Sequence, residues 1–200
     1  MTEHLFTPQN RSVDGVTSIA LDDANVYFAS AGSIHRITFA DGAETTFFAA
    51  TAPFPIVRSI VVDSTNAYWI QQDDAIVKMP LSGGPVTRLF EWGPFALFPT
   101  SIAQQGSDLF VADSGGGYSW SDDGQISGRG SILKLSTVAP GTPEVLAASL
   151  PFPTSIAVAA DGVYFGGGQI QQSVRKWAPV QRVGSNHAVA MSTPRPSCPT

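Results

Sequence analysis

Four segments of the chain share one pattern, a serine followed by an isoleucine and then by mostly apolar positions. They are Ser18-Ile19-Ala20-Leu21, Ser59-Ile60-Val61-Val62, Ser101-Ile102-Ala103-Gln104 and Ser155-Ile156-Ala157-Val158. The isoleucines are 41, 42 and 54 residues apart, so two intervals are regular and the third holds about a dozen additional residues. Self-similarity at a fixed period is the signature of a repeat architecture. We therefore expect four units of about 42 residues.

Each unit holds three further segments that are typical of short strands. The second segment follows an Asn, Asp or Gly turn and is aromatic: Asn25-Val26-Tyr27-Phe28, Asn66-Ala67-Tyr68-Trp69, Asp108-Leu109-Phe110-Val111 and Gly162-Val163-Tyr164-Phe165. The third carries a basic residue: Ile34-His35-Arg36-Ile37, Ile76-Val77-Lys78-Met79, Ile132-Leu133-Lys134-Leu135 and Val174-Arg175-Lys176-Trp177. A fourth follows a glycine-bearing turn, as at 45–48 and 86–89. We name these strands A to D and expect an antiparallel meander.

The strands are apolar without a clean alternation of polar and apolar positions, so each meander must be covered on both of its faces. Blades stacked around a central axis achieve this cover, and the sequence therefore predicts an all-β protein, a β-propeller of four consecutive four-stranded antiparallel blades. Four blades are the smallest number in the usual range. Two forms remain open at this point: a complete four-bladed ring, or a fragment of a larger ring, which would allow self-association.

One stretch in the third unit is more specific than the general repeat. Residues Leu109-Phe110-Val111-Ala112-Asp113-Ser114-Gly115 resemble the LYVADTG core of an NHL repeat, and Tyr68-Trp69 is similar to the start of a YWTD motif. The chain thus resembles the NHL and YWTD-type propeller group, which is six-bladed and TolB-like. That resemblance favours the partial ring and, by analogy alone, an extracytoplasmic location. It implies an architecture, and no function follows from it.

Composition narrows the classes of partner. Only 14% of the residues are charged, and the formal net charge is −5. The sequence contains no run of Lys or Arg. A nucleic-acid partner is therefore not expected. No apolar run approaches the length of about 18 residues that a membrane span needs, so we expect no membrane insertion, and the N-terminus shows no signal-peptide pattern. The single cysteine, Cys198, leaves no internal disulfide or Cys-based metal cluster.

The additional residues of the third unit lie between strands B and C, at 113–130. In a meander, the B–C loops and the D–A connections to the next blade lie on one face of the disc. The D–A connections contain Pro53-Phe54-Pro55, Pro94-Phe95 with Phe98-Pro99, and Pro151-Phe152-Pro153. Because Phe54, Phe98 and Phe152 recur at each blade joint, we expect them to fill the gaps between blades.

The loop face is the predicted recognition surface, because functional residues concentrate on loops held by a rigid scaffold. Aromatic residues that do not recur, together with neighbouring charges, suit contact with a ligand or partner. The predicted binding residues are Tyr118, Trp120, Asp122, Asp123, Arg129, Trp92 and Phe95. The acidic run Ser121-Asp122-Asp123-Gly124 lacks the alternating Asp pattern of a calcium loop, so no metal and no cofactor is predicted.

Other polar residues suggest structure more than chemistry. His35 shares its repeat position with Val77, Leu133 and Arg175, which favours a structural histidine in mid-blade. The four recurring serines are typical of residues that bond the backbone, whereas a nucleophile needs one activated copy. The recurring cations Arg36, Lys78, Lys134 and Lys176 fit stems that lie between blades. Asp22 and Asp63 end strand A in only two units, which leaves an acidic channel mouth as a hypothesis.

We therefore predict a non-catalytic binding module for a protein, peptide or glycan, with no catalytic residue assigned. Two alternatives stay open: a propeller hydrolase or lyase, lactonase-like or streptogramin-lyase-like, whose catalytic groups are incomplete here, and a structural surface repeat protein. Residues 1–183 form the propeller blades in this scheme. Residues 184–200 are rich in Ser, Thr and Pro and are expected to be mostly a disordered tail, with a last outer strand near 187–190.

Overall fold

A computed structural model describes most of the repeat region. The described residues are 15–30, 32–49, 56–71, 75–91, 98–115, 119–120, 126–127, 130–150, 152–167 and 181–183. Within them the chain forms strands and turns and no helix, so the predicted all-β class is confirmed. The described residues also contain no helix long and apolar enough to cross a membrane. The predicted tail at 184–200, with its outer strand near 187–190, lies outside the described residues.

Four antiparallel sheets follow one another along the chain, and in each sheet the strands pair in sequence order. The first sheet consists of β1 (Ser18–Leu21), β2 (Asn25–Ser30), β3 (Ser33–Thr38) and β4 (Glu44–Phe48). The second consists of β5 (Val57–Val62), β6 (Asn66–Gln71), β7 (Ala75–Pro80) and β8 (Thr87–Glu91). The third consists of β9 (Pro99–Gln105), β10 (Asp108–Asp113), β13 (Gly130–Ser136) and β14 (Glu144–Leu150). The fourth consists of β15 (Pro153–Ala159), β16 (Gly162–Gly167) and β17 (Gln181–Val183).

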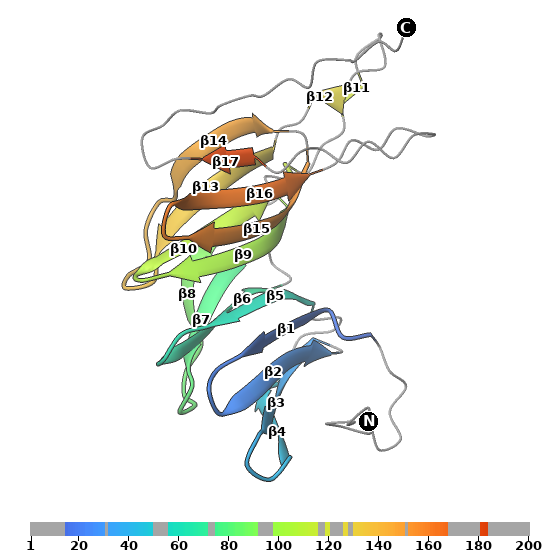
Figure 1. Ribbon diagram of the computed structural model, residues 1–200, viewed down its shortest axis with the longest axis vertical. Helices are drawn as coiled ribbons and strands as arrows, with labels where there is room; N and C mark the ends of the chain where they lie inside the picture. The colour runs from blue at the N-terminus through green and yellow to red at the C-terminus, as the bar shows by residue number, and fades with distance from the viewer. Residues whose placement is uncertain are drawn as a thin grey trace, which may run out of the picture.

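The sheets stack in the order in which they occur in the chain. Strand β1 packs on β5, β5 on β9 and β9 on β15, so the four A strands line one side of the stack. Figure 1 shows the first sheet at one end of this stack and the fourth sheet at the other. This is the face-to-face arrangement predicted for blades. Among the described residues no strand of the first blade packs on a strand of the fourth, so the four blades form an open stack and not a closed four-bladed ring.

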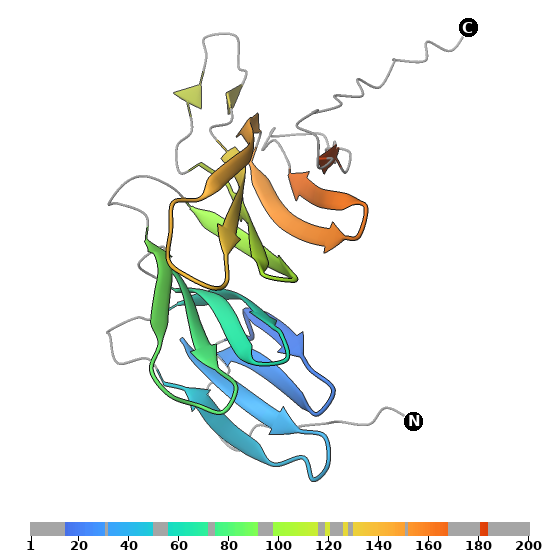
Figure 2. The same ribbon diagram turned by 90° about the vertical axis from the view of Figure 1, so that its left-hand side faces the viewer.

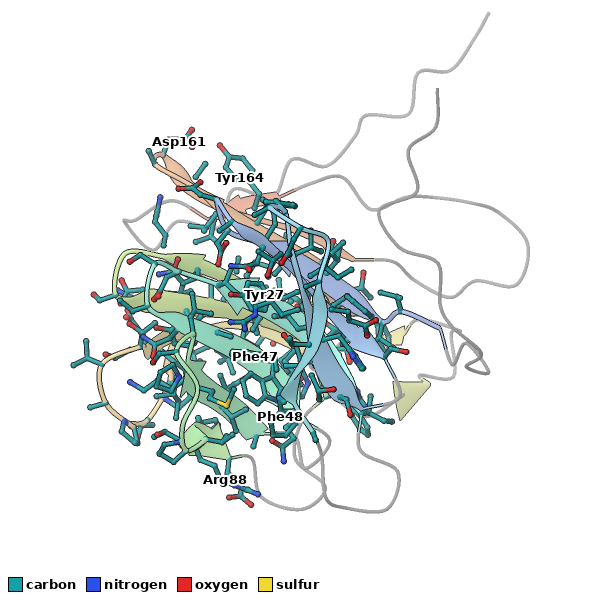
Figure 3. All side chains as sticks on the ribbon, turned by 90° about the horizontal axis from the view of Figure 1, so that it is seen from below. Tyr27, Phe47, Phe48, Arg88, Asp161 and Tyr164 are labelled. Carbon is teal, nitrogen blue, oxygen red and sulfur yellow. The ribbon has the colours of Figure 1, made fainter. Side chains whose placement is uncertain are left out.

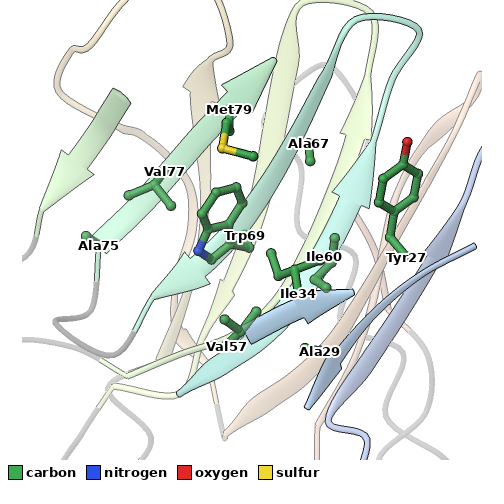
Figure 4. Close-up of a cluster of buried hydrophobic side chains, with 10 residues drawn as sticks. All are labelled: Tyr27, Ala29, Ile34, Val57, Ile60, Ala67, Trp69, Ala75, Val77 and Met79. Atoms are coloured by element: carbon green, nitrogen blue, oxygen red, sulfur yellow. The ribbon is translucent and has the colours of Figure 1, made fainter. Parts of the chain in front are cut away.

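Three apolar clusters hold the stack together, one between each pair of successive blades. The first joins Tyr27, Ala29 and Ile34 to the face of the second blade around Trp69, as Figure 4 shows. The second joins the opposite face of the second blade, around Tyr68, to the third, and the last joins the third blade, around Phe110, to the fourth. Both faces of the inner blades are therefore buried, which explains why their strands are apolar at nearly every position.

The fourth blade differs from the sequence prediction in its third strand. The repeat pattern placed this strand at 174–177, a segment outside the described residues, whereas the strand that pairs with β16 is β17. In this register Arg182 lies opposite Tyr164, as Arg36 lies opposite Tyr27 and Lys78 opposite Tyr68. The recurring cation of the fourth blade is thus Arg182 and not Lys176. Two basic segments of similar composition stand six residues apart, and only the pairing distinguishes them.

Candidate functional site

The insertion of the third blade leaves the sheet between β10 and β13, where the sequence predicted it. Inside it, β11 (Ser119–Trp120) and β12 (Ile126–Ser127) form a two-stranded antiparallel hairpin, with Trp120 opposite Ile126. Figure 2 shows this hairpin standing away from the four sheets. A hairpin is the simplest way for a long loop to pair its own backbone groups, because a bare loop would have to leave them to solvent.

The predicted binding residues fall almost wholly outside the part of the chain that can be described. Only the backbone of Trp120 is placed, in β11. The others lie in undescribed segments: Tyr118, Asp122, Asp123, Arg129, Trp92 and Phe95. Their role in binding stays a prediction. The structure does describe the two ends of the insertion, residues 113–115 and 130–131, which we call its root.

The root is organised by Asp113, a fully buried carboxylate at the end of β10. Its Oδ1 accepts hydrogen bonds from the backbone N–H groups of Phe98 and Gly115, both at 2.9 Å, and its Oδ2 accepts one from the Ser131 hydroxyl at 3.2 Å. Phe98 belongs to the D–A connection, Gly115 to the start of the insertion and Ser131 to its end. One buried side chain therefore joins all three segments, and charge-assisted bonds of this kind are stronger than neutral ones.

Further contacts tighten the same junction. Ser114 donates from its N–H and its hydroxyl to the Phe98 carbonyl, at 2.9 and 3.1 Å. The Thr100 hydroxyl lies 3.0 Å from the carbonyl of Pro153, at the start of the fourth blade. A Cβ added to Gly130 would meet the Pro153 ring and would lie 2.8 Å from the Leu150 carbonyl oxygen, so only glycine fits there. The B–C insertion and the D–A connections thus share one face, as predicted.

The connection between the third and fourth blades is strained beside this root. Ser149 has φ 58° and Phe152 has φ 46°, a left-handed conformation that is unfavourable for residues other than glycine. Each such residue costs about 1–3 kcal/mol and persists only where its surroundings hold it. Buried Leu150 and Pro153, which lie on either side of Phe152 and close against Gly130, supply that hold.

The phenylalanines of the D–A connections do not all fill gaps between blades. Phe98 is 44% exposed and Phe152 is half-buried, while Phe54 lies outside the described residues. The prolines Pro99 and Pro153 are buried instead. The packing interpretation is therefore wrong for Phe98. Its side chain is available to solvent at the foot of the insertion, and sequence recurrence alone could not separate its role from that of the adjacent proline.

On the opposite rim, aspartates hold the A–B turns. The hydroxyls of Tyr27, Tyr68 and Tyr164 donate to carboxylates of Asp22, Asp63 and Asp161 at 3.0, 2.7 and 2.9 Å. Figure 3 shows Asp161 and Tyr164 together at one turn. The third blade has Phe110 in place of tyrosine and needs no such acceptor. The three A–B turns that have a tyrosine therefore also have an aspartate that accepts its hydroxyl, and the acidic channel mouth stays a hypothesis.

The electrostatics of these turns follow from burial and hydrogen bonding. Burial pushes the pKa of Asp63 upward, but bonds from the Tyr68 hydroxyl and the Thr65 and Asn66 amides outweigh it and lower the pKa below its ordinary value. The pKa of Asp22 is lowered in the same way, by bonds that outweigh its burial. Burial and the bond to Asp63 raise the pKa of Tyr68 to about 12.

The other polar residues have structural partners. His35 is buried, its Nδ1 lies 2.9 Å from Glu44 Oε1, and its ring stacks on Phe28, which agrees with a histidine in mid-blade. Lys78 Nζ crosses to the third blade and donates to the Thr137 carbonyl at 2.7 Å. Among the described residues there is no group of three or more His, Cys, Asp or Glu that could hold a metal ion.

Comparisons with known proteins identify the fold. No family model and no curated protein matches the chain. Among solved structures, the computationally designed Ika4 protein superposes with a TM-score of 0.61 at 12% identity, over 84% of this chain and 93% of that one. BamB from Moraxella catarrhalis, a propeller, superposes with a TM-score of 0.52 at 16% identity, over 78% of this chain but 41% of its own. A chain of a nidogen/laminin complex reaches 0.45 at 17% identity, over 76% and 72%, too distant to argue from.

The chain is a β-propeller built from four consecutive blades. At these identities the similarity establishes the fold alone, and membership in the NHL or YWTD group stays a prediction. Sequence reasoning did not single out Asp113 as the residue that organises the insertion. A signal was present, because Ser30, Gln71 and Gly167 end strand B in the other blades and only the third blade has a carboxylate there.

Proposed function

We propose that this propeller is a non-catalytic binding module whose recognition surface is the third blade's insertion together with the neighbouring D–A connections. The observation that carries the proposal is the root of the insertion, where buried Asp113 joins both ends of the insertion to the connection at Phe98. In blades one and two a short loop joins strand B to strand C. The fold therefore does not require the insertion or its root.

A rigid root matters because ordering a loop at the moment of binding weakens affinity. A long loop that is already fixed at both ends loses less conformational freedom when a partner docks. Aromatic side chains at such positions supply large contact areas, and tryptophan, tyrosine and arginine are enriched among residues that dominate binding energy. Tyr118, Trp120 and Arg129 have this character, and Phe98 adds an exposed aromatic ring at the foot of the insertion.

We also infer that the third blade is of the NHL type. The geometry at Asp113 gives a physical reason for the Asp-x-Gly spacing in Asp113-Ser114-Gly115: the carboxylate accepts the Gly115 N–H, and Gly115 has φ 80°, which favours glycine. Substitution of Gly115 by alanine should therefore lower the free energy of unfolding, although Gly115 lies in the loop after β10. An unchanged midpoint of urea unfolding would count against this interpretation.

The proposed binding function is tested with defined probes, a glycan array and a phage-displayed peptide library. The wild-type chain is compared with a double variant, Tyr118→Ala with Trp120→Ala, and with the control Phe39→Ala, which removes an exposed phenylalanine in the C–D turn on the opposite rim. We expect saturable binders that the double variant loses and the control keeps, with unfolding temperatures close to wild type. Binders that survive the double substitution, or no saturable binder in either collection, would overturn the proposal.

A further inference from the structure

The junction between successive blades repeats the same polar contact. Ser18 Oγ in the first blade accepts a hydrogen bond from the Ile60 N–H in the second, at 2.9 Å. Ser59 Oγ in the second blade accepts one from the Ile102 N–H in the third, at 3.2 Å. Threonines add a second contact, because the hydroxyls of Thr17 and Thr100 donate to a carbonyl at the start of the next A strand. Ser18 and Ser59 thus bond backbone, as predicted for the recurring serines, and the amide that each one bonds belongs to the next blade.

The donor half of this junction, the isoleucine N–H, is bare at the first blade. Ile19 pairs with Phe28 in the register in which Ile60 pairs with Trp69 and Ile102 with Val111. Ile60 and Ile102 are 3% and 4% exposed because a preceding blade covers them, whereas Ile19 is 64% exposed and its neighbour Leu21 is 67% exposed.

The Ile19 amide is oriented for the same contact. Bonded and non-bonded pairs alternate in an antiparallel ladder. The Asp22 N–H bonds to Asn25, so the N–H of Ile19, three residues earlier, points away from β2. Ile60 stands in the same relation to the bonded pair of Asp63 and Asn66, and its N–H reaches a serine. The first blade therefore presents both an apolar surface and an amide donor of the kind that a preceding blade covers.

The acceptor half, the serine hydroxyl oxygen, is bare at the fourth blade. Ser155 stands where Ser18 and Ser59 stand in their repeats, and it is exposed, as are Thr154 and Ala157. Ser155 and Ala157 alternate along β15 with Ile156 and Val158, which pack on the third blade, so Ser155 and Ala157 belong to the face that points away from the third blade. Blade four thus offers the hydroxyl half of the junction, at the end of the stack opposite to Ile19 (Figure 1).

We propose that a second copy of this chain docks head-to-tail on these faces. Blade four of each copy covers blade one of the other, and Ser155 Oγ of one copy accepts from the Ile19 N–H of its partner. The two bare surfaces are the two halves of a junction whose serine–isoleucine bond the chain makes twice within itself, so each is complementary to the other. Closure at both ends gives a ring of twofold symmetry with eight blades, which lies within the range known for propellers. The proposal does not depend on the binding face proposed above.

Solution mass provides the first test. The chain has a mass of 21.1 kDa, so sedimentation equilibrium should give twice that value, 42.2 kDa. We expect Ile19→Asp to give 21.1 kDa with an unchanged circular dichroism spectrum, because the side chain is exposed in the single chain. The matched control is Val138→Asp, a valine that is 73% exposed in the turn between β13 and β14, and it should remain a dimer. A wild-type monomer, an open series of larger assemblies, or a dimer that persists in Ile19→Asp would overturn the proposal.

A disulfide between copies tests which faces meet. One chain carries Ser155→Cys and the other Ile19→Cys, and Cys198 is replaced by serine in both. At the first two internal junctions the serine hydroxyl reaches the amide of the isoleucine, so we expect cysteines at these two positions to fall within disulfide range. Under a mild oxidant we expect a covalent dimer when the two chains are co-expressed and none from either chain alone. A mixture that stays uncross-linked while sedimenting as a dimer would place the interface elsewhere.

Discussion

The first and second blades carry nearly the same sequence pattern, yet they differ in how much of it is buried. The second blade has a neighbour on each face, and Trp69, Tyr68 and Ile70 are all almost completely buried. The first blade has a neighbour on one face only, so Tyr27 is buried while Ile19 is mostly exposed. The strand pattern is thus a property of the repeat, whereas burial is a property of the position in the stack. Apolar residues on the outer face of the first blade mark a surface that the repeat is built to cover.

The largest expected effect separates these two blades. Trp69→Ala should lower the free energy of unfolding by about 3–5 kcal/mol, because it empties a fully buried site between the first and second blades where the ring also packs on Phe48. Phe28→Ala, at the same register position in the first blade, should cost less than about 2 kcal/mol, because Phe28 is half-buried. Urea unfolding of the two variants measures the difference. Equal losses would mean that both faces of the first blade are covered within one chain.

A second prediction compares two glycines of the third blade. Gly130→Ala should cost about 2–3 kcal/mol, because the new methyl group would clash with two backbone carbonyls and the Pro153 ring at the insertion root. Gly141→Ala, in a turn with nothing within 4 Å of the added carbon, is the control and should be nearly neutral. Thermal unfolding of both variants is the measurement. If Gly130→Ala left the unfolding temperature unchanged, the insertion root would be able to move apart and make room for the new methyl group.

A third prediction compares the tyrosine turns with the phenylalanine turn of the third blade. The pKa of Tyr68 is raised to about 12, so its contribution to stability is complete below pH 10 and is lost as the pH rises from 10 through 12. Tyr68→Phe should cost about 1 kcal/mol at pH 8 and should flatten this part of the pH profile. At acidic pH the sign is reversed. Because the pKa of Asp63 is lowered in the folded protein, this carboxylate stabilises the fold above its ordinary pKa, and the stabilisation is lost as the pH falls through its pKa in the folded state. An unaltered alkaline profile in Tyr68→Phe would assign the loss to other groups.

The smallest effect is expected at the open face. In dissociated chains, Ile19→Ala should change the free energy of unfolding by less than about 0.5 kcal/mol, as surface substitutions usually do. Ile60→Ala, the same substitution one repeat later, should cost about 2–4 kcal/mol because Ile60 is covered by the first blade. Both variants are unfolded at a protein concentration at which the solution mass is that of one chain, so that a partner copy does not cover Ile19. A large loss for Ile19→Ala under those conditions would contradict the open stack.

Local pattern was sufficient for most of the fold. The spacing of the repeats predicted the A and B strands, their antiparallel order and the place of the insertion, because the residues that determine each feature lie within one repeat. Partners farther away were not predictable in the same way. Ser18 and Ser59 bond an amide 42 and 43 residues further along the chain, in the next repeat. Asp113 bonds the Phe98 amide, which is only 15 residues away, but this contact occurs in one blade and so leaves no trace in the repeat pattern.

Two errors have a similar physical origin. The third strand of the fourth blade was placed at 174–177 because that segment matched the repeat, but β pairing is decided by non-local contacts and selected Gln181–Val183. The contacts of Asp22 and Asp63 in their turns were not predicted, because only two repeats carry an acid at that position. Their tyrosine partners were the missed signal: an acid is present in the three blades that have tyrosine, and absent where Phe110 removes the hydroxyl.

Site-resolved amide hydrogen exchange tests most directly the claim that one junction is repeated along the stack. The Ile60 N–H points away from its own sheet partner and is held by Ser18 Oγ of the preceding blade. We expect Ser18→Ala to speed exchange at Ile60 by about five- to tenfold, the effect of losing one hydrogen bond, while exchange at Ile102, which is held by Ser59, is unchanged. Unaltered exchange at Ile60, or an equal increase at both isoleucines, would contradict it.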